Sequence, residues 1–98
     1  MKKGPDLDKA LGIAMKRQRE DLRLSQSELA KKAGVSQSWI SLVENAKRGK
    51  RPSLKVLKRI SVALGLNSLS SLIHRVEIVA YGPNILDQAR ALFYDVKE

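Results

Sequence analysis

Hydrophobic side chains recur every three or four residues along most of the chain, which is the period of an amphipathic helix. The first such segment spans residues 7–22, with Asp6 and Asp8 where the positive end of a helix dipole favours acidic side chains. The stripe predicted to face the core comprises Leu7, Leu11, Ala14, Met15, Gln18 and Leu22. The polar residues 1–6, which include a Gly-Pro step, are predicted to form a flexible arm before this helix.

Residues 24–45 predict two short helices joined by a tight turn. Ser25 followed three residues later by Glu28 is the pattern of a capping box, so a helix is expected to begin near Gln26. Gly34 stands where the chain must leave that helix, in a left-handed conformation that glycine adopts at little cost. The side chains predicted to face inward are Leu29, Ala30 and Ala33.

The second of these two helices is expected to begin after Ser36, with Val35 as a buried plug in the turn. Ile40 and Val43 supply its inward stripe. The residues that remain to look outward are Gln37, Ser38, Ser41 and Leu42. Two short helices with a glycine turn between them form a helix-turn-helix pattern, and such an outward face suits the edges of DNA bases.

Two further helical segments follow. Ser53 is the cap of one that ends at Gly65, with a predicted core face of Leu54, Leu57, Ile60, Ser61 and Leu64. Ser68 starts the other, which stops at Tyr81-Gly82-Pro83 and carries Leu69, Leu72, Ile73, Val76, Val79 and Ala80 on its apolar face. A strand over residues 76–80 is the less favoured alternative.

The last segment, from Asn84 onward, is predicted to be a helix with a broad apolar face. That face comprises Ile85, Leu86, Ala89, Leu92, Phe93 and Val96. It holds more apolar surface than docking on the preceding helices requires, and surplus apolar surface usually marks an interface. We therefore predict a homodimer whose contacts are made by Ile85, Leu86, Leu92, Phe93 and Val96. The alternative is that this helix folds back on its own core and that dimers form only on DNA.

Charge divides the chain into two parts. The whole chain has 19 basic and 10 acidic side chains, for a net charge of +9. Residues 1–66 hold 16 basic and 6 acidic side chains, net +10, whereas residues 67–98 hold 3 and 4, net −1. A run without any acid follows Asn45 and contains Lys47, Arg48, Lys50, Arg51, Lys55, Lys58 and Arg59. We interpret this run as phosphate-binding rather than as an ordinary solvated face, because it directly follows the outward-facing helix. Lys16, Arg17 and Arg23 are left open as solvated charges or phosphate contacts.

Several classes of function find no support in the composition. The chain has no cysteine and a single histidine, His74, which leaves no disulfide, no cysteine-ligated zinc and no multi-histidine metal site. The carboxylates are scattered, and no phosphate-binding glycine loop or nucleophile elbow occurs. His74 is interpreted as a structural or surface residue. We predict a protein that is not an enzyme, that needs no cofactor or metal, and that acts in the cytoplasm on the nucleoid, since no apolar run approaches a membrane span.

The fixed-offset matches in residues 24–65 resemble the lambda-repressor-like, XRE-type helix-turn-helix regulators of bacteria and phages. The matching positions are Leu24-Ser25-Gln26, Glu28-Leu29-Ala30, Gly34-Val35-Ser36, Ile40-Ser41, Glu44-Asn45, Pro52-Ser53-Leu54 and Ala63-Leu64-Gly65. The resemblance covers residues 7–73. It implies an all-α, five-helix DNA-binding domain, here over residues 7–74. Residues 75–98, for which the resemblance gives no match, are predicted from their apolar face to be a C-terminal helical extension for dimerisation.

The resemblance also implies roles for individual residues. Gln26 matches a glutamine that contacts phosphate and braces the glutamine at the head of the recognition helix, here Gln37, while Arg19 and Glu44 match a structural pair. The predicted base-contacting residues are Ser36, Gln37, Ser38 and Leu42. Leu42 replaces a residue that is often polar or basic, which favours contact with a thymine methyl group. From the resemblance and the charge pattern together, the predicted contacts to the DNA backbone are Gln26, Trp39, Ser41, Asn45, Lys47, Arg48, Lys50 and Arg51. Core burial of Trp39 is the alternative.

Three functions compete. The leading hypothesis is a sequence-specific regulator of transcription, a repressor that reads a palindromic operator through two copies of the helix over residues 36–45. The second is the antitoxin of a toxin–antitoxin pair, whose C-terminal helices would cover a protein partner. An RNA-binding module is the weakest, because aromatic residues make up only 4% of the chain and provide no stacking platform.

Overall fold

The computed structural model describes residues 6–47 and 51–82. Over these residues the protein consists of five helices and no strand, as the sequence predicted, and residues 76–80 are helical. The helices are α1 (Leu7–Asp21), α2 (Gln26–Ala33), α3 (Gln37–Glu44), α4 (Leu54–Ala63) and α5 (Leu69–Tyr81). Three groups of predicted residues lie outside the described part. They are residues 1–5 of the predicted arm, the cations Arg48 and Lys50, and the predicted dimerisation residues Ile85, Leu86, Leu92, Phe93 and Val96.

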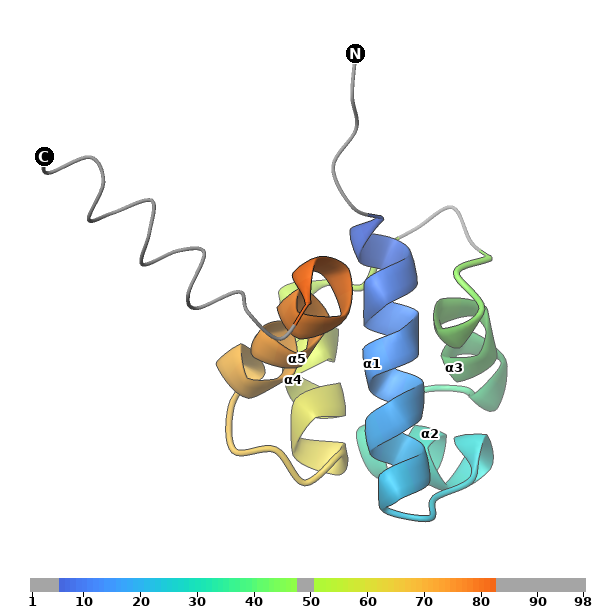
Figure 1. The fold of residues 1–98 in the computed structure, drawn as a ribbon. Coiled ribbons are helices and arrows are strands. Elements are labelled where there is room, and N and C mark those ends of the chain that lie inside the picture. Colours follow the sequence, from blue (N-terminus) through green and yellow to red (C-terminus); the bar gives the residue numbers. More distant parts are fainter. Residues whose placement is uncertain (1–5, 48–50, 83–98) are drawn as a thin grey trace, which may run out of the picture.

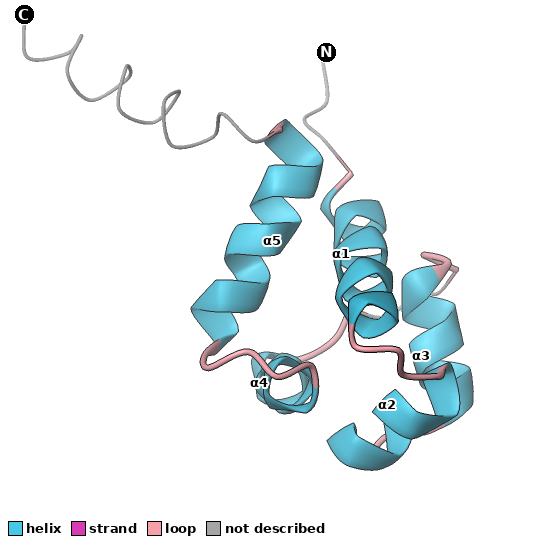
Figure 2. Ribbon diagram, turned by 60° about the horizontal axis from the view of Figure 1, so that its bottom comes forward, coloured by secondary structure: helices cyan, strands magenta, loops and turns pink. Residues whose placement is uncertain are grey.

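Helix α1 runs through the middle of the fold, with α2 and α3 on one side and α4 and α5 on the other (Figure 1). Figure 2 shows the same division after rotation. Helix α5 lies beside α1, and α4 and α2 are both at the lower edge of this view. The contacts agree, because α1 packs on α3 and α5, α2 packs on α3 and α4, and α4 packs on α5. The pair α2 and α3 is therefore held from behind by α1 and α4.

Every described helix begins at a side chain that accepts a hydrogen bond from the backbone N–H three residues on. These caps are Asp6, Ser25, Ser36, Ser53 and Ser68. At Ser25 the capping box is complete, because Ser25 N–H also donates to the Glu28 carboxylate at 2.7 Å. The two hydrogen bonds from Ser25, the backbone one first, lower the pKa of Glu28. The serine caps predicted from the sequence are thus confirmed.

The core lies where the inward stripes of the helices meet around α1. Its most completely buried hydrophobic side chains are Met15, Leu29, Ile40, Ile60, Leu64 and Leu72. Ser61, predicted to face the core, is also buried and donates to Leu57 O at 2.8 Å. Val35 is half-buried against this core, so the predicted plug is only partly covered. Among the described residues, no helix combines the length and apolarity needed to cross a bilayer.

Three positions predicted to face the core are exposed, and so is Ile73, which was predicted to lie on the apolar face of its helix. Leu54 is 70% exposed, Leu7 50% and Leu22 43%. Each of these three residues stands at an end of its helix, Leu7 and Leu54 as the first residue and Leu22 as the cap that follows the last. Ile73, in the middle of α5, is 37% exposed because it lines an open groove between α5 and the start of α1. A helical period identifies which face turns inward, but not how far the neighbour reaches.

Candidate nucleic-acid interface

The turn between α2 and α3 has the predicted glycine geometry. Gly34 adopts φ +71°, and its N–H donates to Lys31 O at 3.3 Å, while the N–H of Val35 donates to Ala30 O at 3.0 Å. These bonds use carbonyls at the carboxyl end of α2 that would otherwise lack partners. The chain then reaches Ser36, whose hydroxyl accepts from Trp39 N–H and starts α3. The helix-turn-helix predicted from the sequence is present.

A buried ion pair ties α1 to the end of α3. Arg19 Nε donates to Glu44 Oε2 at 2.7 Å, and Nη2 donates to Oε1 at 3.0 Å. Arg19 Nη1 also donates to Leu24 O at 2.8 Å, ahead of α2. The two side chains are only 10% and 2% exposed. The hydrogen bond to Glu44 raises the pKa of Arg19, against the opposing effect of burial. The pair that the resemblance implied therefore forms, and it fixes α1, α2 and α3 relative to one another.

Glu44 continues this network to the surface through two glutamines. Gln26 Nε2 donates to Glu44 Oε1 at 3.0 Å, and Gln37 Nε2 donates to Gln26 Oε1 at 2.6 Å. Because a carboxylate only accepts hydrogen bonds, the amide of Gln26 must present its nitrogen to Glu44 and its oxygen to Gln37. One N–H and the carbonyl oxygen of Gln37 then remain without a hydrogen bond to the described residues. The arrangement holds an oriented, exposed amide at the head of α3.

The outward face of α3 carries most of the remaining predicted base contacts. Ser38 and Leu42 are exposed together with Gln37, whereas Ile40 and Val43 are buried on the opposite side. Ser36 is also exposed, although its hydroxyl already serves as the cap of the helix. The structure therefore brings these predicted positions onto one accessible face.

Besides Gln26, the predicted contacts to the DNA backbone on α3 and at its end are also engaged within the protein. Asn45 Nδ2 donates to Ser41 O at 2.9 Å and to Ser41 Oγ at 3.3 Å, so both residues are turned toward each other at the end of α3. Trp39 is half-buried and packs against the core. This position is intermediate between the predicted contact with the DNA backbone and the alternative of core burial.

The basic side chains that follow α3 differ in their exposure and in the groups that they contact. Lys47 is exposed directly after the helix. Arg51 has a side chain that is 81% exposed, with its Nε 3.4 Å from Asp8 Oδ1. Arg59 behaves differently from the phosphate contact predicted for it, because Nε donates to Ala33 O at 3.0 Å and Nη2 to Gly34 O at 2.7 Å. Only the packing of α4 against α2 reveals this contact.

Sequence reasoning also missed Gly12. It lies in α1 directly against the end of α3, where an added Cβ would come within 2.5 Å of Val43 O and 2.7 Å of Glu44 O. A glycine inside a helical pattern costs about 1 kcal/mol relative to alanine, so its presence was a usable signal of close approach. This contact places the backbone of α3 against α1.

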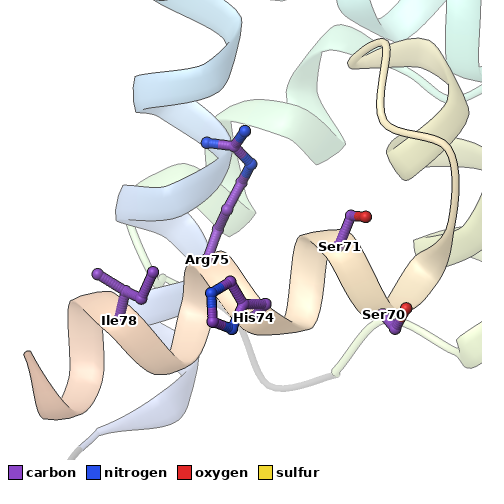
Figure 3. A pocket seen from close by; sticks show the side chains of 5 residues that line it. All are labelled: Ser70, Ser71, His74, Arg75 and Ile78. Atoms are coloured by element: carbon purple, nitrogen blue, oxygen red, sulfur yellow. The ribbon is translucent and has the colours of Figure 1, made fainter. Parts of the chain in front are cut away.

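Among the hollows in the described part are two that border α5, away from α3. The first is an apolar groove of about 270 Å³ between the start of α1 and α5, and its lining includes Leu7, Leu11, Leu57, Ile73, Val76 and Tyr81. The second, along α5, is lined by Ser70, Ser71, His74, Arg75 and Ile78 (Figure 3). His74 is exposed there, as a surface residue. In the described ranges, no three carboxylate or histidine side chains gather as metal ligands would.

The comparisons with known proteins agree with this geometry. A family model described as a helix-turn-helix domain matches residues 10–69. The ImmF control region 10 kDa protein of Bacillus phage phi105 is 32% identical over 74 residues, which cover 76% of this chain and 80% of that protein. The clp gene regulator ClgR from Corynebacterium glutamicum has a similar structure, with a TM-score of 0.70 and 29% identity over 95% of this chain and 97% of ClgR.

SinR, the master regulator for biofilm formation, has been solved in complex with DNA. Its similarity has a TM-score of 0.57 at 35% identity, covering 64% of this chain and 97% of SinR. A complex of SinR with the SinI protein matches with a TM-score of 0.62 at 28% identity, over 85% of this chain and 78% of that one. The family model spans more than half of the chain, and the fold and sequence of these regulators agree with it. The chain therefore belongs to the helix-turn-helix family of lambda-repressor-like, XRE-type DNA-binding regulators.

Proposed function

We propose that the protein is a sequence-specific repressor of transcription that inserts α3 into the major groove of a palindromic operator, in the cytoplasm. The observation that carries this proposal is the chain of hydrogen bonds from Glu44 through Gln26 to Gln37. It orients an exposed amide at the start of a helix whose outward face is otherwise small and accessible. An ordinary surface glutamine has no such support.

The free groups of Gln37 match adenine. In the major groove adenine presents N7 as an acceptor and the N6 amino group as a donor, and a glutamine amide can pair with both. The bond to Gln26 uses one N–H of Gln37 and leaves the other N–H for N7 and the carbonyl oxygen for N6. Leu42, which is 44% exposed on the same face, would meet a thymine methyl group.

Contacts to the DNA phosphates would come from the cations around this face. Lys47 follows α3 and is exposed, and the net charge of +10 over residues 1–66 favours approach to a polyanion. Arg51 would have to exchange its exposed ion pair with Asp8 for a phosphate, which costs little because exposed pairs are worth at most about 1 kcal/mol. SinR in its complex with DNA is the comparison that supports this use of the family fold.

Replacing Gln37 with alanine is expected to weaken binding to the preferred site by about 1–3 kcal/mol, while binding to random DNA barely changes. The preferred site would first be selected from random duplexes, and affinities would be measured by titration of labelled DNA at several salt concentrations. Wild-type affinity should fall steeply with salt, because bound cations release condensed counterions.

Lys47→Ala is the matched comparison, since it removes a charge beside the same helix. It should weaken binding to all sequences similarly and reduce the salt dependence. Equal losses of specific and random-DNA binding in Gln37→Ala would show that α3 does not read bases. No binding of the wild type to any duplex at low salt would refute the whole proposal.

We further propose that the regulator is a homodimer, because a palindromic operator requires two recognition helices about 34 Å apart. The apolar groove beside α5 is where the described part exposes Leu7, Ile73 and Tyr81, close to the point at which the chain continues into residues 83–98. Those residues contain Ile85, Leu86, Leu92, Phe93 and Val96. An exposed apolar groove on α5, followed in the sequence by an apolar segment, supports self-association.

The dimer proposal predicts that the full chain sediments as a dimer at micromolar concentration and that truncation before Asn84 yields a monomer. Apolar surface buried between two copies drives association, so its loss should abolish the dimer. The far-ultraviolet circular dichroism of the truncated chain serves as a control for folding. A full-length chain that stays monomeric at micromolar concentration would contradict the prediction.

A second candidate function is supported by the complex of SinR with SinI, which shows a relative of this fold assembled with another protein. In that case the groove and residues 83–98 would accept a different chain, as in the antitoxin of a toxin–antitoxin pair. The sedimentation experiment separates the two, since a monomer that dimerises neither alone nor on DNA favours a heterologous partner.

A further inference from the structure

Arg59, in the second half of α4, contacts the turn that joins the two helices of the DNA-reading unit. Its Nε donates to Ala33 O at 3.0 Å, and its Nη2 donates to Gly34 O at 2.7 Å. Both acceptors lie at the carboxyl end of α2, where backbone carbonyls lack partners within the helix and carry the negative end of its dipole. A guanidinium suits this position because its planar fork can donate two bonds in a fixed geometry.

A second, independent observation comes from Gly34. A Cβ placed on this residue would lie 2.6 Å from Nη2 of Arg59, which is the nearest atom to it among the described residues outside its two chain neighbours. The guanidinium therefore occupies the space that the glycine leaves open. Gly34 is favoured at this turn by its left-handed φ of +71°, and its missing side chain leaves the space that the end of Arg59 fills.

We propose that Arg59 is a positioning residue for DNA recognition, acting through the turn on α3 rather than on phosphate. The step from contact to function is short. The clamped carbonyls of Ala33 and Gly34 are followed after one residue by Ser36, which caps α3. Gln37 comes next, and its amide must reach Gln26 at the other end of α2. A turn that loosens lets α3 rotate against α2 and breaks that alignment. This inference rests on the proposed readout of DNA by α3.

A phosphate contact would be the alternative role for Arg59, and the two roles make opposite predictions. A residue that binds phosphate contributes to every DNA sequence and to the release of counterions. A residue that only positions α3 contributes to the preferred site alone, and its removal leaves the number of released counterions unchanged. Specificity is thus the measurement that a role confined to folding would not alter, whereas the salt dependence separates positioning from phosphate binding.

The test compares Arg59→Ala and Arg59→Lys with Lys58→Ala, an exposed neighbour on α4, at a temperature well below the melting transition of each variant. We expect Arg59→Ala to weaken binding to the selected site about tenfold, with random-DNA affinity and the salt slope equal to those of the wild type. Arg59→Lys should restore little, because an ammonium lacks the planar fork. Lys58→Ala should leave the ratio of specific to random binding unchanged.

A double-mutant cycle on folding tests the contact itself. Gly34→Ala should lower the urea midpoint less in the Arg59→Ala background than in the wild type, because the obstructing guanidinium is gone and only the conformational strain remains. The cycle can be completed with Arg59→Lys if the double alanine variant is unfolded. Additive effects in the cycle would overturn the clamp.

The binding data have equally definite outcomes. Equal losses on both kinds of DNA with a shallower salt slope would assign Arg59 to phosphate binding and overturn the inference. An unchanged specificity ratio in folded Arg59→Ala would overturn it as well, by limiting the residue to stability. A wild type without any preferred site would instead refute the proposed function, and this inference with it, whatever the folding cycle shows.

Discussion

Replacing Arg19 with methionine is expected to lower the free energy of unfolding by about 3–5 kcal/mol, because it leaves a carboxylate unpaired inside the protein. The Glu44 side chain is only 2% exposed and receives two of the guanidinium bonds. The same change removes the donor to Leu24 O. For a domain of this size such a loss is a large share of the total free energy of unfolding. The loss would be measured by urea denaturation at a low temperature, at which the variant is still folded before urea is added.

Two further variants identify the cause of that loss. Arg19→Lys keeps the charge but not the fork, and we expect it to recover part of the stability. Arg19→Met combined with Glu44→Leu removes both charges and should be more stable than Arg19→Met alone, since the buried carboxylate is gone. A loss below about 1 kcal/mol for Arg19→Met would place the pair in the class of exposed ion pairs and contradict its burial.

The helices were predictable from local signals. A serine before an apolar stripe supplies the side-chain acceptor that a helix start needs, and Ser25, Ser36, Ser53 and Ser68 all serve this way. Gly34 marked the turn for the same reason, because its φ of +71° is costly for most other residues. These signals act within a few residues, so they require no knowledge of the fold.

Exposure near the helix ends was not predictable in this way. Leu54 continues the stripe of α4 by its spacing, yet nothing in the spacing tells where the neighbouring helix stops. The groove that exposes Leu7 and Ile73 likewise depends on how α1 and α5 are arranged in space. Periodicity describes one helix, whereas burial depends on two.

The candidate site shows a similar division. Gln26, Gln37 and Glu44 are separated by up to 18 residues, and only the resemblance to a family suggested that their side chains meet. The contact between Arg59 and the turn spans 25 residues and had no signal of either kind, because Arg59 belongs to a basic run whose place after α3 predicted phosphate binding. Long-range polar contacts require the crossing of helices to be known.

Gly12→Val is the other change expected to have a large effect, at about 3 kcal/mol of lost stability. The position is in the middle of α1, where a glycine is normally the least favourable residue apart from proline, so substitution in an exposed helix would stabilise the protein. Here the new Cβ would meet two carbonyl oxygens of the α3 backbone, at 2.5 and 2.7 Å. Backbone cannot rotate aside as a side chain can, so α3 has to shift as a whole.

Two comparisons separate this steric cause from an effect of backbone conformation. One compares Gly12→Ala with Gly12→Val, and the other uses a substitution at Gly65 as the control. Gly12→Ala should cost less than Gly12→Val, about 1–2 kcal/mol, because it adds the obstructing Cβ without the branched methyl groups. Gly65→Ala is the control, since Gly65 has φ +74° but only a distant contact at 3.9 Å, so it should lose about 1 kcal/mol from conformation alone. Since Glu44 stands at the obstructed end of α3, the Gly12 variants should also lose preference for the selected DNA site, whereas Gly65→Ala should keep it. Urea denaturation in which Gly12→Ala is more stable than the wild type would show that α1 and α3 are not in such close contact.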